Sequence, residues 1–246
     1  MKSRWKNGVR RGFACLPHAM QHEIRRWRFA GQIRCGSFRS QEQEYELLEQ
    51  LLREGDWAID VGANVGHYTS KMSQLVGNTG RVIAFEPVPD TFELLAANAR
   101  SYEYPNVTLF NAAVGERSEV HGFRIPGWTY GAPNYYRAHL DDADPAFHVF
   151  FCSIDSLHLP NVVALIKIDV EGATEAVLRG AGKLIERDRP TLVIEGEPDS
   201  ILPLLRVSGY RLWRYPGSPN VILRAGETAL AGAELPVDFG PVEVSS

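Results

Sequence analysis

Acidic and amide side chains recur in this sequence at one kind of position, directly after a short apolar run. Each run predicts a buried strand. Because the carboxyl ends of parallel strands meet at one edge of a sheet, we expect the groups that follow them to share a rim where ligands bind. One acid at such a place often only caps the next helix, but a polar group at every strand end indicates a binding or catalytic site. These groups are Asp60, Glu86, Asn111, Asp169 with Glu171, and Glu195.

The first of these acids lies in a stretch that predicts a nucleotide pocket. Residues 57–68 read Trp-Ala-Ile-Asp-Val-Gly-Ala-Asn-Val-Gly-His-Tyr, which indicates a buried strand, a glycine turn and the start of a helix over 65–76. Gly62 and Gly66 allow a positive φ and let a ligand approach the backbone. A glycine turn at a helix N-terminus is a frequent nucleotide site, although the same glycines can serve packing alone.

The residues around this turn indicate which nucleotide is bound. A dinucleotide site has a further glycine where this chain has Asn64, and Asp60 would repel a pyrophosphate. The same carboxylate suits a cationic ligand without phosphate, such as S-adenosylmethionine, which carries a sulfonium and an ammonium. Glu86 follows the turn by about 20 residues, the spacing at which an acid accepts both hydroxyls of a ribose; its alternative role is a helix cap. Asn111 and Ala112, after the third strand, complete the expected cofactor site.

The composition limits the classes of protein to consider. A chain of 246 residues with 44% hydrophobic residues can bury one sizeable core. Its net charge of -4 argues against a general nucleic-acid binder. Cys15, Cys35 and Cys152 are odd in number and are not spaced as metal ligands, which fits a reducing compartment. No apolar run is long enough to span a bilayer or to form the core of a signal peptide, so we expect a cytoplasmic protein.

The chain divides by composition into an arm, a main domain and a tail. Residues 1–39 hold ten Lys and Arg against one acid, Glu23, and predict a basic arm with a helix over 10–29. We expect this arm to be a solvated segment that packs on the domain or on a second subunit, and the alternative is contact with anionic lipid or an acidic partner. The main domain is expected over 40–224 and an irregular tail over 225–246.

Strand and helix patterns alternate within the main domain, which predicts an α/β fold with a doubly wound parallel sheet and right-handed crossovers. Ser40 is expected to cap the first helix. A long connection over 126–148 carries aromatic and acidic residues and is expected to form a substrate loop or lid. The expected helices are 40–54, 65–76, 90–101, 174–187 and 201–208, and the expected strands are 57–61, 81–85, 107–110, 119–125, 149–154, 163–170, 191–194 and an antiparallel pair 210–215 and 220–223.

Four segments of the chain carry a family resemblance, namely Asp60–Gly66, Phe85–Pro87, Ile154–Leu157 and Lys167–Gly172 with Glu175. Together they resemble those of the FkbM family of class I S-adenosylmethionine-dependent methyltransferases. The resemblance covers roughly residues 40–224 and implies a Rossmann-like, seven-stranded sheet whose last strand pair is reversed. It also implies methyl transfer, usually to a hydroxyl, with acceptors among small natural products, sugars and lipid-linked glycans. The arm and the 126–148 loop lie outside the shared segments, so the identity of the acceptor does not carry over.

The residues that bind and deprotonate the methyl acceptor are predicted at the end of the fourth central strand, 163–170. An alcohol must lose its proton at or near attack, so a general base or a metal-bound alkoxide is expected. Asp169 and Glu171 are two residues apart and point to the same side if the strand persists, with Glu195 on the neighbouring strand. Lys167 either holds Asp169 ionised or only forms a buried ion pair. The three acids could instead hold Mg²⁺, but no histidine makes that interpretation specific and no metal ligand is assigned. His67 and Glu195 are the next candidates for the base.

Two other enzyme classes compete with this interpretation. A nicotinamide-dependent oxidoreductase is disfavoured by Asn64 and by the lack of a Tyr-x-x-x-Lys pair. A nucleic-acid base methyltransferase usually has an Asn- or Asp-Pro-Pro-aromatic stretch where this chain has Asp169-Val170-Glu171-Gly172. We therefore expect an O-methyltransferase with a small-molecule or glycan acceptor and no nucleic-acid partner. The sequence leaves the oligomeric state open.

Overall fold

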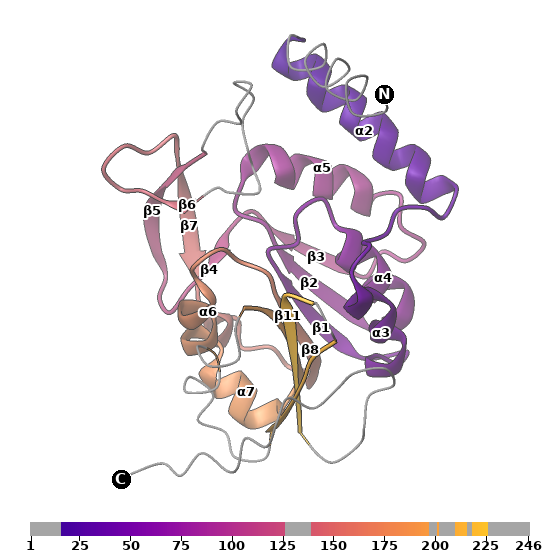
Figure 1. The fold of residues 1–246 in the computed structure, drawn as a ribbon, viewed down its shortest axis with the longest axis vertical. Helices are drawn as coiled ribbons and strands as arrows, with labels where there is room; N and C mark the ends of the chain where they lie inside the picture. The colour runs from indigo at the N-terminus through magenta and orange to yellow at the C-terminus, as the bar shows by residue number, and fades with distance from the viewer. Residues whose placement is uncertain (1–15, 126–138, 197–200, 202–209, 216–217, 226–246) are drawn as a thin grey trace.

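The computed structural model describes residues 16–125, 139–196, 201, 210–215 and 218–225. Its centre is a seven-stranded sheet in the order β10-β11-β9-β8-β1-β2-β3 (Figure 1). The strands from β9 to β3 run parallel, and β11 pairs antiparallel with both β9 and β10, which confirms the predicted fold class. The bounds are β1 Trp57–Val61, β2 Arg81–Phe85, β3 Val107–Phe110, β8 Val163–Ile168, β9 Thr191–Glu195, β10 Tyr210–Trp213 and β11 Asn220–Ala225.

The order of the strands reverses at β1. Strands β1, β2 and β3 follow one another towards one edge of the sheet, whereas β8 lies on the other side of β1. The register pairs Asp60 of β1 with Lys167 of β8, and Val61 of β1 with Phe85 of β2. In open α/β sheets ligands bind at such a reversal, beyond the carboxyl ends of the strands. The topology therefore places a site beside the turn that follows β1.

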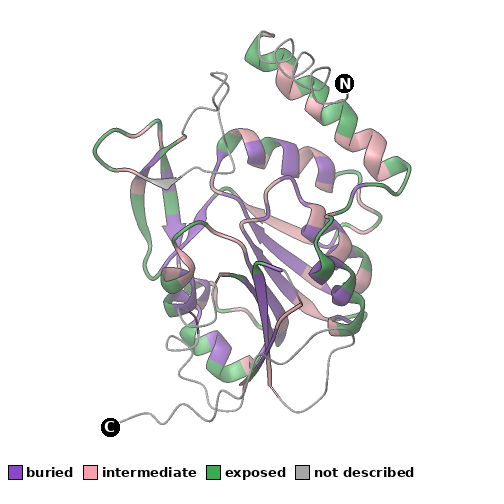
Figure 2. Ribbon diagram, in the orientation of Figure 1, coloured by how far each residue is buried: buried purple, intermediate pink, exposed green. Residues whose placement is uncertain are grey.

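Helices cover both faces of this sheet, and their inward sides are buried (Figures 1 and 2). Successive strand side chains point to opposite faces. Ala58 of β1 accordingly packs in one cluster with Met72 of α4, and Ile59 packs in another with Val177 of α6. Helices α3, α4 and α5 lie on the first face, and α6 and α7 lie on the second. The bounds are α2 His18–Arg34, α3 Gln43–Leu51, α4 His67–Val76, α5 Pro89–Ala99, the 3₁₀ turn η2 Ile154–Leu157, α6 Thr174–Gly180 and α7 Gly182–Asp188.

A second sheet of four strands, in the order β4-β7-β5-β6, follows the carboxyl edge of the first (Figure 1). Only Asn111 and Ala112 separate the end of β3 from the start of β4, so the chain carries this sheet directly from the rim of the main sheet. Phe123 and Phe151 contribute to its small core. The sequence predicted β5 and β7 but missed the two-residue strands β4 and β6. The bounds are β4 Ala113–Val114, β5 Glu119–Arg124, β6 His139–Leu140 and β7 Phe147–Cys152.

Two predicted element ends are wrong near the site. Strand β8 ends at Ile168 and not at residue 170, because the Asp169 N–H makes a last bond of 3.0 Å to the Val61 carbonyl before β1 turns away. Ser40 does not cap the first helix, which begins at Gln43. The Ser40 hydroxyl instead accepts a bond of 3.2 Å from the Glu42 N–H and forms a turn ahead of α3.

The helix predicted over 174–187 is two helices, α6 and α7. The chain bends after Gly180, which lies so close to the Gly115 carbonyl that a Cβ at this position would collide with it. The new helix N-terminus needs acceptors for its free N–H groups. Asp155 supplies them, because its two carboxylate oxygens accept bonds of 2.9 Å from the N–H groups of Lys183 and Leu184. The Ile154–Leu157 segment therefore has a structural role in starting α7.

The described part of the basic arm packs on the main domain. Its helix is α2, His18–Arg34, so the predicted helix extends further than expected, and residues 10–15 lie outside the described residues. α2 lies along α5 (Figure 1), and His22 Nε2 is 3.2 Å from the Asp90 carbonyl oxygen. The apolar part of this contact is made by Phe29, Ile33, Phe38, Val65 and Leu94.

Several predictions fall wholly or partly outside the described residues. They are the 126–138 part of the substrate loop, the 201–208 helix apart from Ile201, the turn at 216–217 and the tail from residue 226. Ile201 is buried in the main core. Of the helices that the structure describes, none has the length and apolar character needed to cross a bilayer.

Candidate active site

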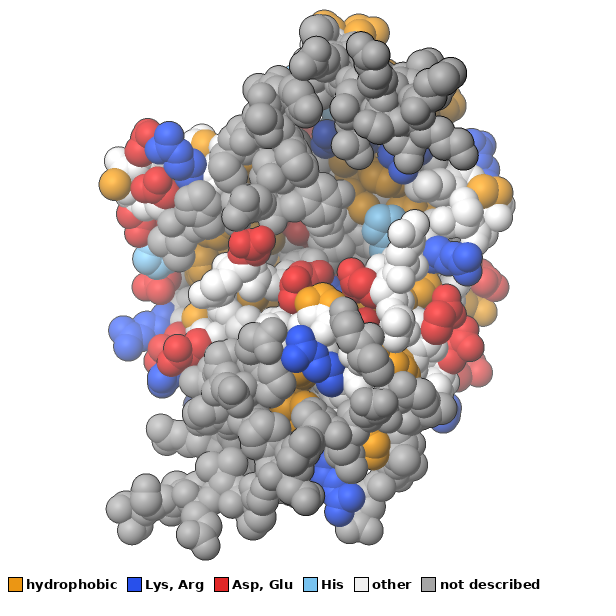
Figure 3. All heavy atoms as spheres, viewed as in Figure 1, with side chains coloured by type: hydrophobic (Ala, Val, Ile, Leu, Met, Phe, Trp, Pro, Cys, Tyr) orange, Lys and Arg blue, Asp and Glu red, His pale blue; other side chains and the backbone are white. Residues whose placement is uncertain are grey.

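A cavity of about 490 Å³ lies at the carboxyl edge of the main sheet, where the strand order reverses. Its wall comes from the turn after β1, the ends of β2, β8 and β9, and strand β4 of the second sheet. Acidic side chains gather near the centre of the face of the molecule that Figure 3 shows. Eight of the predicted site residues line the cavity, namely Gly62, Asn64, Glu86, Ala112, Lys167, Asp169, Glu171 and Glu195.

The glycine turn has the predicted positive φ angles, but the glycines are required by packing. Gly62 has φ +78° and Gly66 has φ +95°. A Cβ on Gly62 would collide with the carbonyl oxygen of Asp169, and a Cβ on Gly66 would collide with Tyr102. The expectation that both glycines leave room for a ligand is therefore incomplete, because the space beside each is already filled by this chain.

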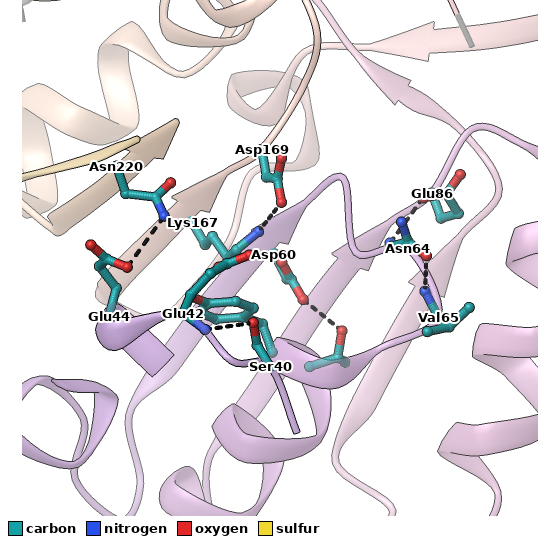
Figure 4. Close-up of polar contacts among 12 residues, drawn as sticks. Ser40, Glu42, Glu44, Asp60, Asn64, Val65, Glu86, Lys167, Asp169 and Asn220 are labelled. Carbon is teal, nitrogen blue, oxygen red and sulfur yellow. Dashed lines mark hydrogen bonds and ion pairs between the residues drawn. The ribbon is translucent and has the colours of Figure 1, made fainter. Parts of the chain in front are cut away.

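Asn64 joins the turn to Glu86. It adopts φ +53°, a conformation that asparagine tolerates better than most side chains. Its backbone N–H donates a bond of 2.9 Å to Glu86 Oε2, and its side-chain oxygen accepts a bond of 2.8 Å from the Val65 N–H (Figure 4). Glu86 Oε1 accepts a further bond of 2.9 Å from the Val88 N–H. Backbone donors thus fix both oxygens of this carboxylate.

Glu86 is a buried carboxylate at the wall of the cavity, with 6% of its surface exposed. Burial disfavours its charged form, and the two N–H donors only partly offset this, so its pKa is raised to about 7. Glu86 can therefore change its charge near neutral pH. Each carboxylate oxygen also keeps lone-pair capacity for a ligand hydroxyl.

Asn111 lies behind the cavity wall and bonds to the chain after β2. Its side-chain N–H donates bonds of 2.9 Å to the Glu86 carbonyl and 3.2 Å to the Pro87 carbonyl. It therefore holds the ends of β2 and β3 together, and the next residue, Ala112, lines the cavity. Three predicted cofactor residues, Asp60, Gly66 and Asn111, lie behind the wall of the cavity and do not line it.

Asp60 is fully buried under the turn and does not line the cavity. Its Oδ2 accepts a bond of 2.6 Å from the Thr69 hydroxyl, and its Oδ1 has no hydrogen-bond partner among the described residues. Burial raises the pKa of Asp60, and the neighbouring Lys167 opposes this. Asp60 therefore lies beneath the turn and behind the cavity wall, next to Thr69 and Lys167.

Lys167, Asp169 and Glu195 form a connected group across the ends of β8 and β9. Lys167 Nζ lies 2.8 Å from Asp169 Oδ2, so the expected ion pair is present (Figure 4). Burial opposes ionisation of Asp169, but Lys167 and a hydrogen bond with Glu195 outweigh it and lower the pKa of Asp169. The same hydrogen bond, with burial, raises the pKa of Glu195 to about 7. Below about pH 7 Glu195 is therefore protonated beside an ionised Asp169.

Two further residues of this group were missed by the sequence. The ring of Tyr68 lies 4.4 Å from Lys167 Nζ, and its hydroxyl donates a bond of 2.6 Å to Glu42 Oε2. Both Tyr68 and Glu42 line the cavity. Tyr68 had one usable signal, its place in the first turn of the helix after the glycine turn. Glu42 had none, because it precedes the first strand of the domain.

Glu171 and His67 stand apart from the Lys167 group. Glu171 lines the cavity from the exposed turn after β8, since the strand does not continue as expected. His67 faces the arm, with its ring 4.3 Å from that of Phe38, and burial lowers its pKa. Among the described residues, no three His, Cys, Asp or Glu side chains are grouped as metal ligands. A role for Mg²⁺ therefore remains a prediction that the metal dependence of turnover tests.

The second sheet supplies an apolar side to the cavity. Phe123 of β5 and Phe151 of β7 line it, with ring centroids 5.9 Å apart. They lie beyond the end of β3 on a different sheet from the charged group. The sequence predicted aromatic contact from the 126–148 loop, of which residues 126–138 lie outside the described residues, and did not predict these two phenylalanines.

Comparisons with known proteins give both a family and a fold. Residues 60–212 match the profile of the family described as "Methyltransferase FkbM domain". Among solved structures, a methyltransferase FkbM from Methylobacillus flagellatus has a TM-score of 0.52 at 18% identity and covers 74% of this chain and 48% of that one. At this identity the structural likeness shows the fold alone.

Curated relatives match over shorter stretches. Protein-L-isoaspartate O-methyltransferase 2 of Archaeoglobus fulgidus is 35% identical over 81 residues, which are 33% of this chain and 35% of that protein. Protein-L-isoaspartate O-methyltransferase 1 of Arabidopsis thaliana is 32% identical over 100 residues, 41% of each chain. The matches therefore span well under half the length of these relatives.

Proposed function

Because the chain belongs to the FkbM methyltransferase family, as four short segments of its sequence predicted, we propose that it transfers the methyl group of S-adenosylmethionine to a hydroxyl of a small molecule, sugar or glycan. The observation that carries this proposal is the presence of two carboxylate arrangements in one cavity. Glu86 is fixed by backbone N–H donors. Asp169 is instead paired with Lys167 at 2.8 Å and keeps its charge, while the pKa of the neighbouring Glu195 is raised to about 7.

The charges of the cavity fit S-adenosylmethionine better than a dinucleotide. Five carboxylates and one ammonium line it, an excess that stabilises a sulfonium and an ammonium and repels a pyrophosphate. The cavity volume of about 490 Å³ lies within the usual range for small-molecule sites. When bound, S-adenosylmethionine supplies an activated methyl group on a positively charged leaving group. The charged lining residues are Glu42, Glu86, Lys167, Asp169, Glu171 and Glu195.

Glu86 would hold the cofactor through its ribose. An ionised carboxylate accepts hydrogen bonds from two neighbouring hydroxyls, and the backbone N–H groups of Asn64 and Val88 already orient Glu86. Gly62, Asn64 and Ala112 would form the wall around the nucleoside. Asp60 would contribute through its charge beneath the turn.

The Asp169–Glu195 pair would take the proton of the acceptor hydroxyl. A general base is most effective when its pKa lies near the working pH, and Glu195 has a pKa of about 7. Lys167 keeps Asp169 ionised, so a proton that reaches an oxygen of the pair is stabilised on Glu195. Tyr68 limits the motion of Lys167 by packing its ring under the ammonium.

The acceptor class follows from the wall opposite these charges. Phe123 and Phe151 provide an apolar surface on which a sugar or ring face can pack. The acidic lining disfavours a phosphate-rich acceptor such as a nucleic acid. The names of the curated relatives place their methyl transfer on oxygen, which supports an oxygen acceptor here.

The test is methyl transfer from labelled S-adenosylmethionine to a panel of sugars, phenols, glycolipids and RNA. We expect label on hydroxyl oxygens of one of the first three classes, identified by mass spectrometry. Label found only in RNA would replace the proposed acceptor, and NAD-dependent oxidation without label transfer would replace the proposed reaction.

A further inference from the structure

The outer face of α2 carries an exposed apolar stripe. Met20 is 51% exposed, Ile24 44% and Trp27 71%. These three side chains are spaced by four and three residues, so they lie in one row along the helix. Three of the six large apolar side chains that are exposed in the described part of the chain therefore belong to a single helical face.

The stripe is separate from the face that holds α2 to the domain. Phe29 and Ile33 point to the cluster under the helix, and His22 points to α5. At about 100° per residue, Met20, Ile24 and Trp27 lie on the opposite side of the helix from these residues. No residue of α2 is fully buried (Figure 2). α2 is thus apolar on two opposite sides, one docked on the domain and one facing outward.

Positive charge surrounds the stripe. Arg28 follows Ile24 by four residues and Arg34 follows Trp27 by seven, which places both beside the row, and both are exposed. Glu23 is the one acid in residues 1–39, against ten Lys and Arg, and it is paired with Arg26 at 3.0 Å. An exposed tryptophan with aliphatic neighbours and flanking arginines is the pattern of a helix that lies in the interface of an anionic membrane.

We propose that α2 binds an anionic lipid surface, with Met20, Ile24 and Trp27 inserted among the acyl chains and the flanking arginines on the headgroups. The charge of the arm favours an anionic surface, because residues 1–39 hold ten Lys and Arg against one acid. Each basic residue near an anionic lipid surface adds to the attraction. Binding of this kind does not depend on the proposed methyl transfer.

The position of α2 gives this binding a consequence that does rest on the proposed function. The inner face of α2 reaches the pocket wall through Phe29, whose ring centroid lies 6.2 Å from that of His67, and Phe38, just after the helix, packs on the same ring at 4.3 Å. The lipid surface and the wall of the cavity are then separated by one helix, about 10 Å across. An acceptor attached to a lipid would be concentrated next to the site.

The test is sedimentation of the full chain with vesicles, compared between two matched triple variants. The first replaces the stripe, Met20→Ser, Ile24→Ser and Trp27→Ser. The control replaces the three exposed apolar residues elsewhere, Val120→Ser, Phe150→Ser and Val162→Ser. Vesicles contain either phosphatidylcholine alone or phosphatidylcholine with phosphatidylglycerol. Thermal melting and S-adenosylmethionine affinity report separately on the fold and on the cofactor site.

We expect the wild-type chain and the control to bind vesicles with phosphatidylglycerol, to bind poorly to neutral vesicles and to be released by salt. The stripe variant should bind at least about tenfold more weakly at an unchanged melting temperature. Failure of the wild type to bind, or equal loss in the two variants, overturns the proposal. So does a wild-type dimer that the stripe variant dissociates while vesicle binding is absent, since the stripe would then join two copies of the chain.

Discussion

Glu86 and Glu195 allow the two sides of the pocket to be compared, because each has a pKa of about 7 for a different reason. The pKa of Glu86, after β2, is raised by burial, and its carboxylate is held by two backbone N–H donors. Glu195, at the end of β9, is more exposed, and the largest cause of its raised pKa is its hydrogen bond with Asp169. A carboxylate on rigid donors is suited to hold a ligand, whereas one that shares a proton is suited to move a proton.

The same contrast extends to the neighbours of each acid. The Glu86 side is organised by backbone groups and by Asn64 and Asn111, none of which carries a charge. The Glu195 side is organised by charged side chains, with Lys167 4% exposed and Asp169 39% exposed. Substitutions on the first side should therefore change cofactor affinity, and those on the second should change turnover.

Asp169→Asn is expected to have the largest effect. It keeps the shape of the side chain, removes the partner charge of Lys167 and ends proton sharing with Glu195. Turnover should fall about 10²–10⁴-fold, while S-adenosylmethionine affinity stays near that of the wild type. Steady-state kinetics and calorimetry measure the two quantities.

Glu171→Gln is the matched control, since it removes the same charge from the same turn without touching Lys167. It should keep most of the turnover. If Glu171→Gln lowers turnover as much as Asp169→Asn does, the base is Glu171. The proton-transfer side of the pocket would then be Glu171 and not the Asp169–Glu195 pair. Partial rescue of either variant by added Mg²⁺ would support the metal alternative.

Glu86→Ala is expected to have the next largest effect, and on affinity. It removes a charged acceptor of ribose hydroxyls and leaves the Asn64 and Val88 N–H groups without their partner, so S-adenosylmethionine should bind about 1–3 kcal/mol more weakly. Calorimetry with the demethylated product should show the same loss of binding affinity, and no methyl transfer takes place during the measurement. The companion variant Glu195→Gln should leave this affinity unchanged, and an equal loss in both would show that the two sides do not act separately.

The pH dependence of cofactor binding should follow Glu86. Hydroxyl donors favour the ionised carboxylate, so binding selects ionised Glu86 and affinity should rise as pH rises through about 7. A group with this pKa predicts a gain of about tenfold between about pH 6 and pH 8. Glu86→Gln should lack this part of the rise, and the difference between the two proteins removes the titration of the ligand itself. Equal slopes would mean that Glu86 does not hold the ribose.

Removal of residues 1–34 should have the smallest effect on the pocket. The deletion keeps Phe38 but exposes the patch that Phe29 and Ile33 cover, so it should lower the free energy of unfolding by about 1–3 kcal/mol. S-adenosylmethionine affinity should stay near wild type, because within the described part of the chain α2 reaches a lining residue through the Phe29–His67 ring contact. A folded truncated protein without cofactor affinity would show that the arm belongs to the site.

The sequence predicted the fold well where it depends on pattern. Alternating strands and helices, and the reversed pair at the end, predicted the right class of sheet because the apolar runs of β1, β2, β8 and β9 are buried on both faces. Strand ends located the rim, since polar residues there have no place in the core. Four short segments in combination, from Asp60–Gly66 to Lys167–Gly172, indicated the family that the comparison confirmed.

The sequence could not predict contacts that depend on which segments meet. Nothing local shows that the Asp169 carbonyl fills the space beside Gly62, or that Asp60 faces Thr69 beneath the turn. The Glu42–Tyr68 bond joins residues 26 apart across two helices. Strands β4 and β6 have two residues each and carry no periodicity. The sequence therefore predicted β5 and β7 but not their assembly into a second sheet that brings Phe123 to the pocket.

Calorimetric titration of the full chain at about pH 8, where a group with a pKa of about 7 is mostly ionised, tests the central claim most directly. The ligands are S-adenosylmethionine, its demethylated product and NAD. We predict that the first two bind at one site per chain, that Glu86→Ala weakens both, and that NAD does not compete. Binding of NAD with neither of the other ligands would contradict the account.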